Sequence, residues 1–534
     1  MNKLTNLILF SVMIALCACN SRELNTKVSN TTGWNYYDQQ TTNFQAQEGV
    51  GNVNPVGMVP IQGGSFTLGE HDEFLTAPRN NAHRSITVSS FYMDKYEITT
   101  LNWNEYLHWM EVVFGAVAPE LVDKARPDRT VWRSEMAYND PYETNYFDHP
   151  AYSFYPIVGV TWVQAMAYCQ WRTDRVNELA LIQSGALAIP AFADLRPLYE
   201  EDEKAEWEEE HGYEMVMMEE RSPENPDSVA ITYRAPYEYI RDKFVFNTDK
   251  YLMDPTYNPE LGRRPKQDSY GEDRKANRAD GIMVTGYRLP TEAEWEFAAY
   301  APVAGEDGLT TEGKIYPWSG YHPRDLSKKN VGQMQANFVR GRGDMMGVSG
   351  ALNDAYVITA PVDAFAPNDF GLYNMAGNVN EWVLDVYRET SSQEIDEYNS
   401  FRGNIYKTPV LDENGRFVMD SLGCILVEYK GSDDKRDFRD GDAASAIKTD
   451  FPLLAAEQER DPEKPYDITD VLAPVISKTS RVYKGGSWKD RIYYLNPSIR
   501  RFMDENECSS TVGFRCAMST LGDQIQTGTG AKVK

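Results

Sequence analysis

The segments Tyr483-Lys-Gly-Gly-Ser-Trp488 and Gly513-Phe-Arg-Cys-Ala517 decide the fold of this 534-residue chain, and the stretch between them decides its chemistry. No cysteine occurs between Ser487 and Cys508. This stretch therefore supplies no pair of thiols for metal binding or disulfide exchange.

Two earlier motifs predict helices through their caps. Thr161 with Gln164, and Thr291 with Glu294, have the spacing of a capping box, in which each side chain bonds the other residue's backbone amide. The first helix is expected to turn Ala165, Tyr168 and Cys169 toward a core.

Near the N-terminal side of the core, the pattern predicts strands and a further helix. Alternation around Gly63 and Gly64 predicts a hairpin over 59–69, and 85–92 reads as a third strand with Ile86 and Val88 on one face. A helix is expected after Thr100, with one side formed by Trp103, Tyr106, Leu107 and Met110.

Together with the closing segments, three motifs in the body of the chain and one at its start stand in a fixed order. They are Met58-Val-Pro-Ile-Gln-Gly-Gly-Ser-Phe66, Val158-Gly-Val-Thr-Trp162, Tyr287-Arg-Leu-Pro-Thr-Glu-Ala-Glu-Trp-Glu296 and Gly371-Leu-Tyr-Asn-Met-Ala-Gly-Asn-Val-Asn-Glu-Trp382. This set resembles the sulfatase-modifying-factor family, whose archetype is the formylglycine-generating enzyme. The resemblance covers most of 56–520 and implies an α+β, C-type-lectin-like fold with little regular secondary structure.

Two regions of different composition interrupt these motifs and read as insertions, at about 181–283 and 388–480. Eight of the eleven residues at 200–210 of the first are acidic, which predicts the solvated face of a helix or, as the alternative, a partner-docking surface. The aromatic residues near 132–146 are either core or interface anchors; they are Trp132, Tyr138, Tyr142 and Tyr146.

The N-terminus has the features of a lipoprotein signal. A short basic start and an apolar stretch too short to span a bilayer end in Leu16-Cys-Ala-Cys19. We expect a signal peptide over 1–18 and a lipid on Cys19, with an ordinary cleaved signal as the alternative. Residues 19–55 would form a tether and 521–534 a flexible tail. No acidic run follows Cys19, which favours the periplasmic face of the outer membrane.

Charge and histidine spacing exclude several functions. A formal net charge of -27 argues against nucleic acid as a partner. The six histidines contain no i, i+4 pair and no HExxH, so a zinc or non-haem iron site is not expected. The acidic balance fits cation binding or docking to a basic protein.

By resemblance, catalysis is lost. The positions of the enzyme family's two redox cysteines hold Asp490 and Leu495, which cannot bind copper(I) or exchange a disulfide. The chain is therefore expected not to be an enzyme and to hold no copper. Two alternatives stay open: an enzyme that uses Ser487, Asp490 and Arg515 in the old cleft, and a module that binds glycan or peptidoglycan.

The resemblance also implies calcium and a disulfide. One calcium site would use Asn374, Gly377, Val379 and Glu381, and a second would use Asn337, Phe338, Asp354 and Tyr356. Oxygen ligands of this kind suit calcium, although a hydrogen-bonded turn is the alternative for the first site. Cys169 and Cys516 occupy positions that pair in the family, with free thiols as the alternative. Whether Cys424 pairs with Cys508 stays open.

Within the family, the gliding-motility lipoproteins of Bacteroidetes are the most similar group. The segments 91–99, 155–160 and 169–178 carry this resemblance. It implies a structural, non-catalytic lipoprotein of the gliding and type IX secretion machinery. The implied partners are a GldK-like lipoprotein and other subunits of that machinery.

Overall fold

The computed structural model describes two thirds of the chain, and the statements that follow concern these residues. They are 28–29, 31–35, 55–69, 81, 83–134, 136–190, 199–221, 229–267, 271–302, 314–318, 320, 322–326, 328, 330–339, 354–387, 401, 407–429 and 479–521. The predicted signal peptide with Cys19, most of the tether, most of 388–480 and the predicted tail after Leu521 lie outside them.

One four-stranded sheet joins distant parts of the chain. Its strand order is β1-β4-β16-β9, and all three pairings are antiparallel. The strands are β1 (Met58–Ile61), β4 (Phe91–Asp94), β16 (Ala517–Ser519) and β9 (Tyr287–Arg288). The last strand of the chain therefore lies in the interior of this sheet, beside one of the first.

A second four-stranded sheet carries the functional motifs. Its order is β14-β13-β10-β15, with β10 parallel to β15 and antiparallel to β13. The strands are β10 (Asn380–Val386), β13 (Ser480–Lys484), β14 (Arg501–Asp504) and β15 (Val512–Gly513). Four two-stranded pairs complete the described strands: β2 (Gly64–Leu68) with β3 (Arg84–Val88), β5 (Val216–Arg221) with β6 (Val229–Arg234), β7 (Lys266–Gln267) with β8 (Asp273–Arg274), and β11 (Lys407–Pro409) with β12 (Val427–Tyr429).

The predicted hairpin over 59–69 is wrong. β1 pairs with β4 and β2 pairs with β3, so the two glycines move the chain from one sheet to another. A Cβ on Gly63 would lie 2.3 Å from the carbonyl oxygen of Val88, which explains why only glycine fits this crossing. The predicted strand over 85–92 is likewise divided into β3 and β4, although Ile86 and Val88 are both buried as expected.

The helices begin where the capping residues predict. Thr161 and Thr291 each form a complete capping box, at the starts of α5 and α9, and Thr99 forms another at α2. The helices are α2 (Thr100–Phe114), α3 (Pro119–Ala125), α4 (Asp140–Asn145), α5 (Trp162–Ser184), α6 (Glu201–His211), α7 (Tyr237–Phe244), α8 (Thr248–Met253) and α9 (Glu292–Tyr300). Short 3-10 turns lie at η1 (Arg129–Trp132), η2 (Pro150–Tyr152), η4 (Arg278–Asp280) and η6 (Ile492–Leu495). The chain thus has a mixed α+β fold with short, scattered elements.

An aromatic core joins α2, α5 and the C-terminal segment. The ring of Trp103 stacks on Tyr168 at 5.4 Å and meets the edge of Phe514 at 6.0 Å. Two of the candidate anchors, Trp132 and Tyr146, are buried in this same core, whereas Tyr138 is exposed. The alternative of core residues is therefore correct for the first two.

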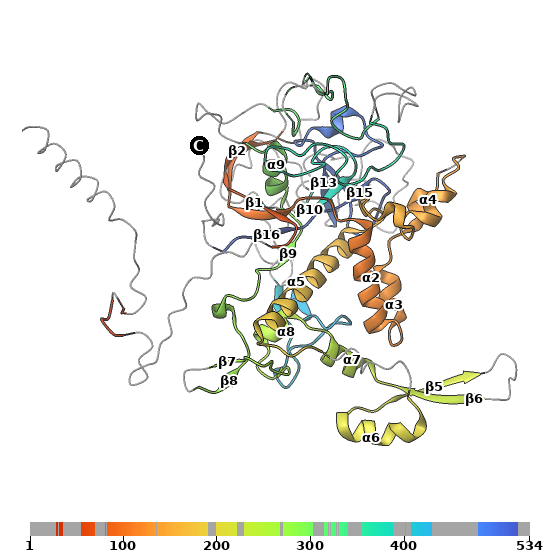
Figure 1. The fold of residues 1–534 in the computed structure, drawn as a ribbon, viewed down its shortest axis with the longest axis vertical. Coiled ribbons are helices and arrows are strands. Elements are labelled where there is room, and N and C mark those ends of the chain that lie inside the picture. The colour runs from red at the N-terminus through yellow and green to blue at the C-terminus, as the bar shows by residue number, and fades with distance from the viewer. Residues whose placement is uncertain are drawn as a thin grey trace, which may run out of the picture.

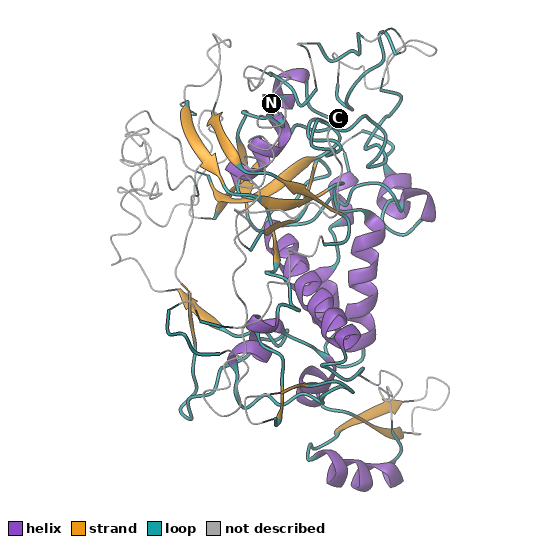
Figure 2. Ribbon diagram, turned by 60° about the vertical axis from the view of Figure 1, so that its left-hand side comes forward, coloured by secondary structure: helices purple, strands orange, loops and turns teal. Residues whose placement is uncertain are grey.

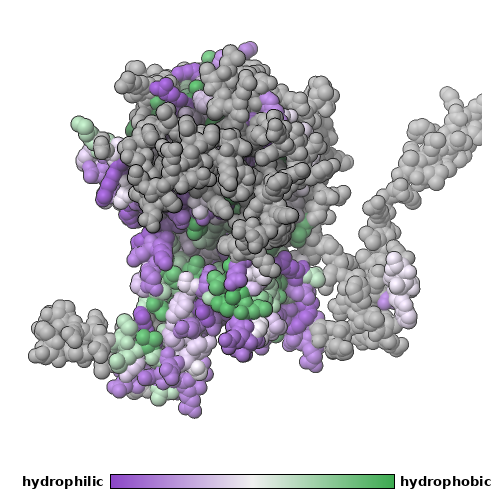
Figure 3. Space-filling view, turned by 180° about the vertical axis from the view of Figure 1, so that it is seen from behind, coloured by the Kyte–Doolittle hydropathy of each residue, from purple (hydrophilic) through white to green (hydrophobic). Residues whose placement is uncertain are grey.

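Helix α5 runs from the sheets to the lower part of the molecule, where α7 and α8 lie (Figures 1 and 2). The acidic segment forms α6, beside the β5–β6 pair. Most of the described side chains of α6 are partly or fully exposed, as a solvated helix face predicts. Trp207 is buried, and its ring centroid lies 4.8 Å from that of Tyr239. Seen from behind, hydrophilic and hydrophobic side chains are interleaved over the lower part of the described surface (Figure 3). None of the helices in the described part of the chain is both long and apolar enough to cross a bilayer.

Candidate functional site

Two sequence motifs dock against each other at the centre of the second sheet. The amide of Gly377 donates to the carbonyl of Gly485, and the amide of Trp488 donates to the carbonyl of Asn378, at 2.8 and 2.7 Å. Gly485 and Gly486 both have positive φ, and a Cβ on Gly486 would lie 2.8 Å from a backbone oxygen. Positive φ favours glycine at both positions, and at Gly486 the nearby carbonyl of Tyr494 also leaves no room for a side chain.

Neither position expected for a redox cysteine offers a metal ligand of the copper type. Asp490 accepts two hydrogen bonds from Arg501, at 2.8 and 2.7 Å, and one from the hydroxyl of Ser487 at 2.6 Å. Burial disfavours the charged form of Asp490, but its bonds with Arg501 outweigh that effect and lower its pKa. Leu495 is fully buried in an apolar cluster with Phe338. An ion pair and a packed aliphatic side chain occupy the two positions.

The nearest cysteine along the chain is not activated. The sulfur of Cys508 lies 3.8 Å from the carboxylate of Asp128. Burial, and then the neighbouring carboxylate, raise the pKa of this thiol to about 11. Since the thiolate is the nucleophilic and metal-binding form, Cys508 remains a protonated thiol at neutral pH.

The carboxylate of Glu381 is held by an internal cation. Both Glu381 and Arg515 are fully buried, and the guanidinium forms two hydrogen bonds with the carboxylate, at 2.6 and 2.5 Å. The indole nitrogen of Trp295 donates a third, at 2.8 Å. Arg515 also donates to the carbonyl of Tyr373. Arg515 is thus an interior structural residue and not part of an open cleft.

One carboxylate that sequence reasoning missed contacts the first predicted calcium loop from another segment of the chain. Glu97 is 2% exposed, and its Oε2 atom accepts hydrogen bonds from the amide groups of Asn374 and Asn378, at 3.0 and 2.8 Å. Its Oε1 atom has no hydrogen-bond partner among the described residues. Burial, and then the charge of Glu381, raise the pKa of Glu97 to about 8 against the opposing effect of Arg515. The available signal was its place in the segment 91–99.

The geometry of this first loop fits a calcium site, but the pairing of Glu381 does not. The structure brings Asn374, Gly377, Val379 and Glu381 into one turn, as the prediction requires. The oxygens of Glu381, however, already face Arg515, whose positive charge opposes a second cation beside the same carboxylate. In contrast to the oxygens of Glu381, the Oε1 atom of Glu97 has no hydrogen-bond partner among the described residues. A calcium ion at this loop would therefore be held through Glu97 and Asn374 more readily than through Glu381.

In the second loop the fit is better. The structure brings Asn337, Phe338, Asp354 and Tyr356 together: the buried carboxylate of Asp354 accepts bonds from the amides of Phe338 and Tyr356, at 3.3 and 3.4 Å. The side-chain nitrogen of Asn337 donates to the carbonyl of Ile358 at 2.8 Å, so its oxygen would be the ligand. A carboxylate, an amide oxygen and nearby carbonyls are the ligands that calcium prefers. Calcium remains a prediction at both loops.

The predicted cysteine pair is brought together. The sulfurs of Cys169, on α5, and Cys516, beside β16, lie 3.5 Å apart, and both residues are buried. Burial, and then the neighbouring thiol, raise the pKa of Cys516 well above its usual value. The disulfide itself remains a prediction, and mass spectrometry of non-reduced peptides from the mature protein is the test.

A second buried charge cluster was not predicted. The ammonium group of Lys484 contacts Glu292 and Glu296 at 3.1 and 2.6 Å, and Arg500 forms two hydrogen bonds with Glu292, at 2.6 and 2.9 Å. All four residues are buried. The four-residue spacing of the two glutamates on α9 was the only signal in the sequence, and it did not identify their partners.

Comparison with known proteins finds one family model that matches most of the chain and several relatives with related names. The family model of the sulfatase-modifying factor enzyme 1-like domain matches residues 44–520. The chain is 23% identical to the formylglycine-generating enzyme of Bos taurus over 72% of each chain. Its identity to the enzyme of the same name from Mus musculus is 43%, over 19% of this chain and 22% of the mouse protein. It is also 38% identical to the inactive C-alpha-formylglycine-generating enzyme 2 of Bos taurus, over 19% of this chain and 28% of the relative.

These two local matches span less than a third of the relatives' own length, whereas the family model spans most of the chain. The motifs that dock in the structure, around Gly377, Gly485 and Arg515, all lie within the matched range. The chain belongs to the sulfatase-modifying factor enzyme 1-like domain family.

Proposed function

We propose that this chain is a non-catalytic lipoprotein that docks and stabilises other subunits of the Bacteroidetes gliding-motility and type IX secretion machinery. It is anchored through Cys19 to the periplasmic face of the outer membrane. Its resemblance is greatest to the gliding-motility lipoprotein GldJ, with the sister lipoprotein GldK as the second reading. Its partners are then a GldK-like lipoprotein and other subunits of the machinery.

The observation that carries the non-catalytic part is the pairing of Asp490. At the positions where the family's enzymes need two thiolates, this chain has a carboxylate bound to Arg501 and a leucine in the core. An ion pair of this kind stabilises the domain but neither binds copper(I) nor reacts with oxygen. The inactive relative in Bos taurus supports the same interpretation, since its name records a family member without the activity.

The docking part is tested by co-purification. The mature lipoprotein is crosslinked in membranes, purified and examined by mass spectrometry for a GldK-like lipoprotein and other secretion subunits. We expect these partners with the wild-type chain and their loss when Cys19→Ala releases the protein from the membrane. Recovery of the wild-type chain without any such subunit would contradict the proposal.

The enzymatic alternative is tested separately. The purified chain, loaded with copper(I), is incubated with a cysteine-containing sulfatase peptide, and an active formylglycine-generating enzyme serves as control. We expect no aldehyde product from this chain. Product formation would overturn the assignment, and binding to peptidoglycan in a sedimentation assay would favour the glycan-binding alternative instead.

Calcium is proposed as a structural cofactor. Calorimetry on the chelator-treated protein measures its binding directly. Absence of binding at millimolar calcium would exclude both predicted sites.

A further inference from the structure

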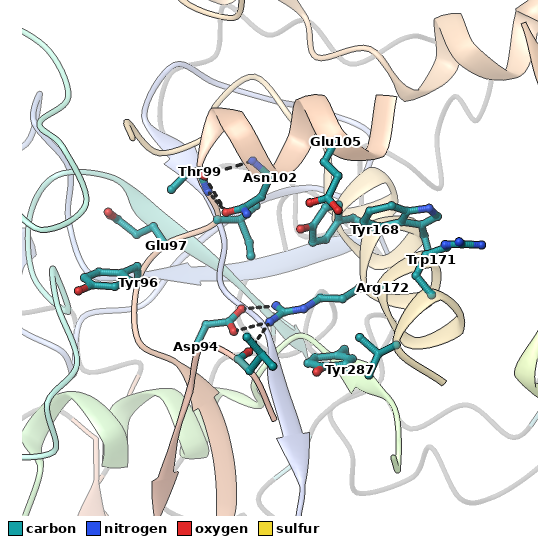
Figure 4. A pocket seen from close by; sticks show the side chains of 15 residues that line it. Asp94, Tyr96, Glu97, Thr99, Asn102, Glu105, Tyr168, Trp171, Arg172 and Tyr287 are labelled. Atoms are coloured by element: carbon teal, nitrogen blue, oxygen red, sulfur yellow. Dashed lines mark hydrogen bonds and ion pairs between the residues drawn. The ribbon is translucent and has the colours of Figure 1, made fainter. Parts of the chain in front are cut away.

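A cavity of about 400 Å³ lies between β4, α2, α5 and β9, and Glu97 is among its lining residues. In Figure 4, Glu105 reaches into it from α2, Tyr168, Trp171 and Arg172 come from α5, Asp94 comes from β4, and Tyr287 comes from β9. This volume is within the range of sites that hold small ligands or single side chains. None of the family's motif residues around Gly377 or Gly485 lines it.

The positive charges around this cavity are already compensated. Arg172 forms two hydrogen bonds with Asp94, at 2.7 and 3.0 Å, and its guanidinium lies over the ring of Tyr287, 4.2 Å from the centroid. Arg175 is paired with Glu178 on the same helix. An anionic ligand would therefore find no unpaired cation here.

The carboxylate of Glu105 has no ion-pair partner or hydrogen-bond donor among the described residues. Glu105 is exposed, so water solvates its charge when no ligand is bound. In Figure 4 this carboxylate points toward the ring of Tyr168. Burial raises the pKa of the Tyr168 hydroxyl well above its usual value, so the hydroxyl stays neutral and its oxygen is available as an acceptor.

The walls between these polar groups are apolar. Ile98 and Val176 line the cavity together with the rings of Trp171 and Tyr287. An alkyl chain can bury its methylene groups along such a surface while its charged end remains beside the carboxylate. A guanidinium fits less well, because Arg172 already occupies the face of Tyr287 on which it would stack.

We propose that this cavity binds the ammonium end of a lysine side chain from a partner protein, with Glu105 as the counter-charge and Tyr168 as a second acceptor. The proposal rests on the docking function proposed above and assigns one contact point to it. The three donors of an ammonium group match these acceptors, and its alkyl stem matches the apolar walls.

The test uses a probe that needs no partner protein. Nα-acetyl-lysine methylamide is titrated into the full mature protein in detergent and followed by saturation-transfer difference NMR. We expect binding, and binding at least about tenfold weaker for the norleucine analogue, which keeps the stem but lacks the charge. Equal binding of the two probes, or no binding of either, would overturn the proposal.

Three variants locate the site. Glu105→Gln, on an exposed helix position, is expected to weaken lysine-probe binding about threefold through loss of a surface ion pair. Val176→Trp fills the cavity and is expected to abolish binding. Glu120→Gln, an exposed carboxylate on α3, is the matched control and should bind like wild type. Wild-type binding by the first two variants would refute the assignment.

The two proposals fail separately. If the co-purification experiment detects partners but the lysine probe does not bind, docking stands and this cavity is not its contact point. If the probe binds as described but no partner co-purifies, the cavity stands and the docking function is wrong.

Discussion

The two loops predicted to bind calcium differ in how their carboxylates are compensated. In the first, Glu381 is fully buried and bound by Arg515 and Trp295, all at 2.8 Å or less. In the second, the carboxylate of Asp354 accepts amide bonds of 3.3 and 3.4 Å. Arg515 supplies a full positive charge, whereas these two donors to Asp354 are neutral backbone amides.

This difference shows that one family scaffold can neutralise interior carboxylates in two ways. An arginine from the closing Gly-Phe-Arg-Cys segment provides a permanent cation for the first loop. The second loop holds its carboxylate with backbone amides, and its carboxylate and amide oxygens are of the kind that calcium prefers. Glu97 lies between these cases, because it is close to Arg515 yet has one oxygen without a partner.

The largest effect is expected for Arg515→Met. It leaves Glu381 buried without its counter-charge, which typically costs about 3–5 kcal/mol of unfolding free energy. Urea unfolding followed by fluorescence measures the loss. Arg133→Met is the control: its pair with Glu143 lies at the surface, where water screens the charges, and should contribute far less.

Arg515→Met also tests whether the two loops differ in the way described. If millimolar calcium restored the stability of Arg515→Met, a metal ion could replace the arginine, and the first loop would also be a calcium site. Equal losses in the two arginine variants would show that burial of the pair has no special weight.

A smaller effect is expected for Asp354→Asn. If the second loop binds calcium, the wild-type chain gains about 2.7 kcal/mol when calcium is a hundredfold above its dissociation constant. The variant should lose this gain while its stability in chelator changes little. Thermal unfolding with and without calcium provides the measurement, and an unchanged calcium response would place the ion elsewhere.

The smallest effect concerns pH and Glu97, whose pKa is raised to about 8 in the folded protein from an ordinary 4.5. The folded state therefore holds this proton more tightly than the unfolded state. Its contribution to stability is complete below pH 4.5 and is lost as pH rises toward 8, by at most about 1.4 kcal/mol per pH unit. Glu97→Gln, a neutral isostere, should flatten this dependence.

Unfolding curves of both proteins at pH 5, 6.5 and 8 test this expectation. Parallel pH dependence in the two would refute the assignment to Glu97. The same measurement is repeated with calcium. If calcium removes the pH dependence of the wild-type unfolding free energy, the ion contacts Glu97, because a ligated carboxylate no longer takes up the proton.

Local signals explain which parts of the fold were predictable. The capping boxes at Thr161 and Thr291 depend on residues three apart, and both were predicted correctly. The hairpin around Gly63 failed because the partners of its strands lie elsewhere in the chain. Alternation indicates strands but does not say which strands pair.

In the candidate site, too, local motifs were predictable and long-range contacts were not. Family motifs gave the members of both loops and the cysteine pair, whose sulfurs do meet. They did not reveal Glu97, which meets its partners across 277 and 281 positions of sequence, or the pairing of Arg515 with Glu381 across 134. Burial and charge compensation of this kind arise only when distant segments pack.

The place of β16 in the first sheet has a consequence for how the protein is made. Residues 517–519 lie between β4 and β9, and until they have left the ribosome the two halves of that sheet have no strand to join them. This sheet therefore cannot close before residues 517–519 have been synthesised. Pairing between segments this far apart in the sequence is slow to form, so closure of the sheet is expected to be a late step of folding.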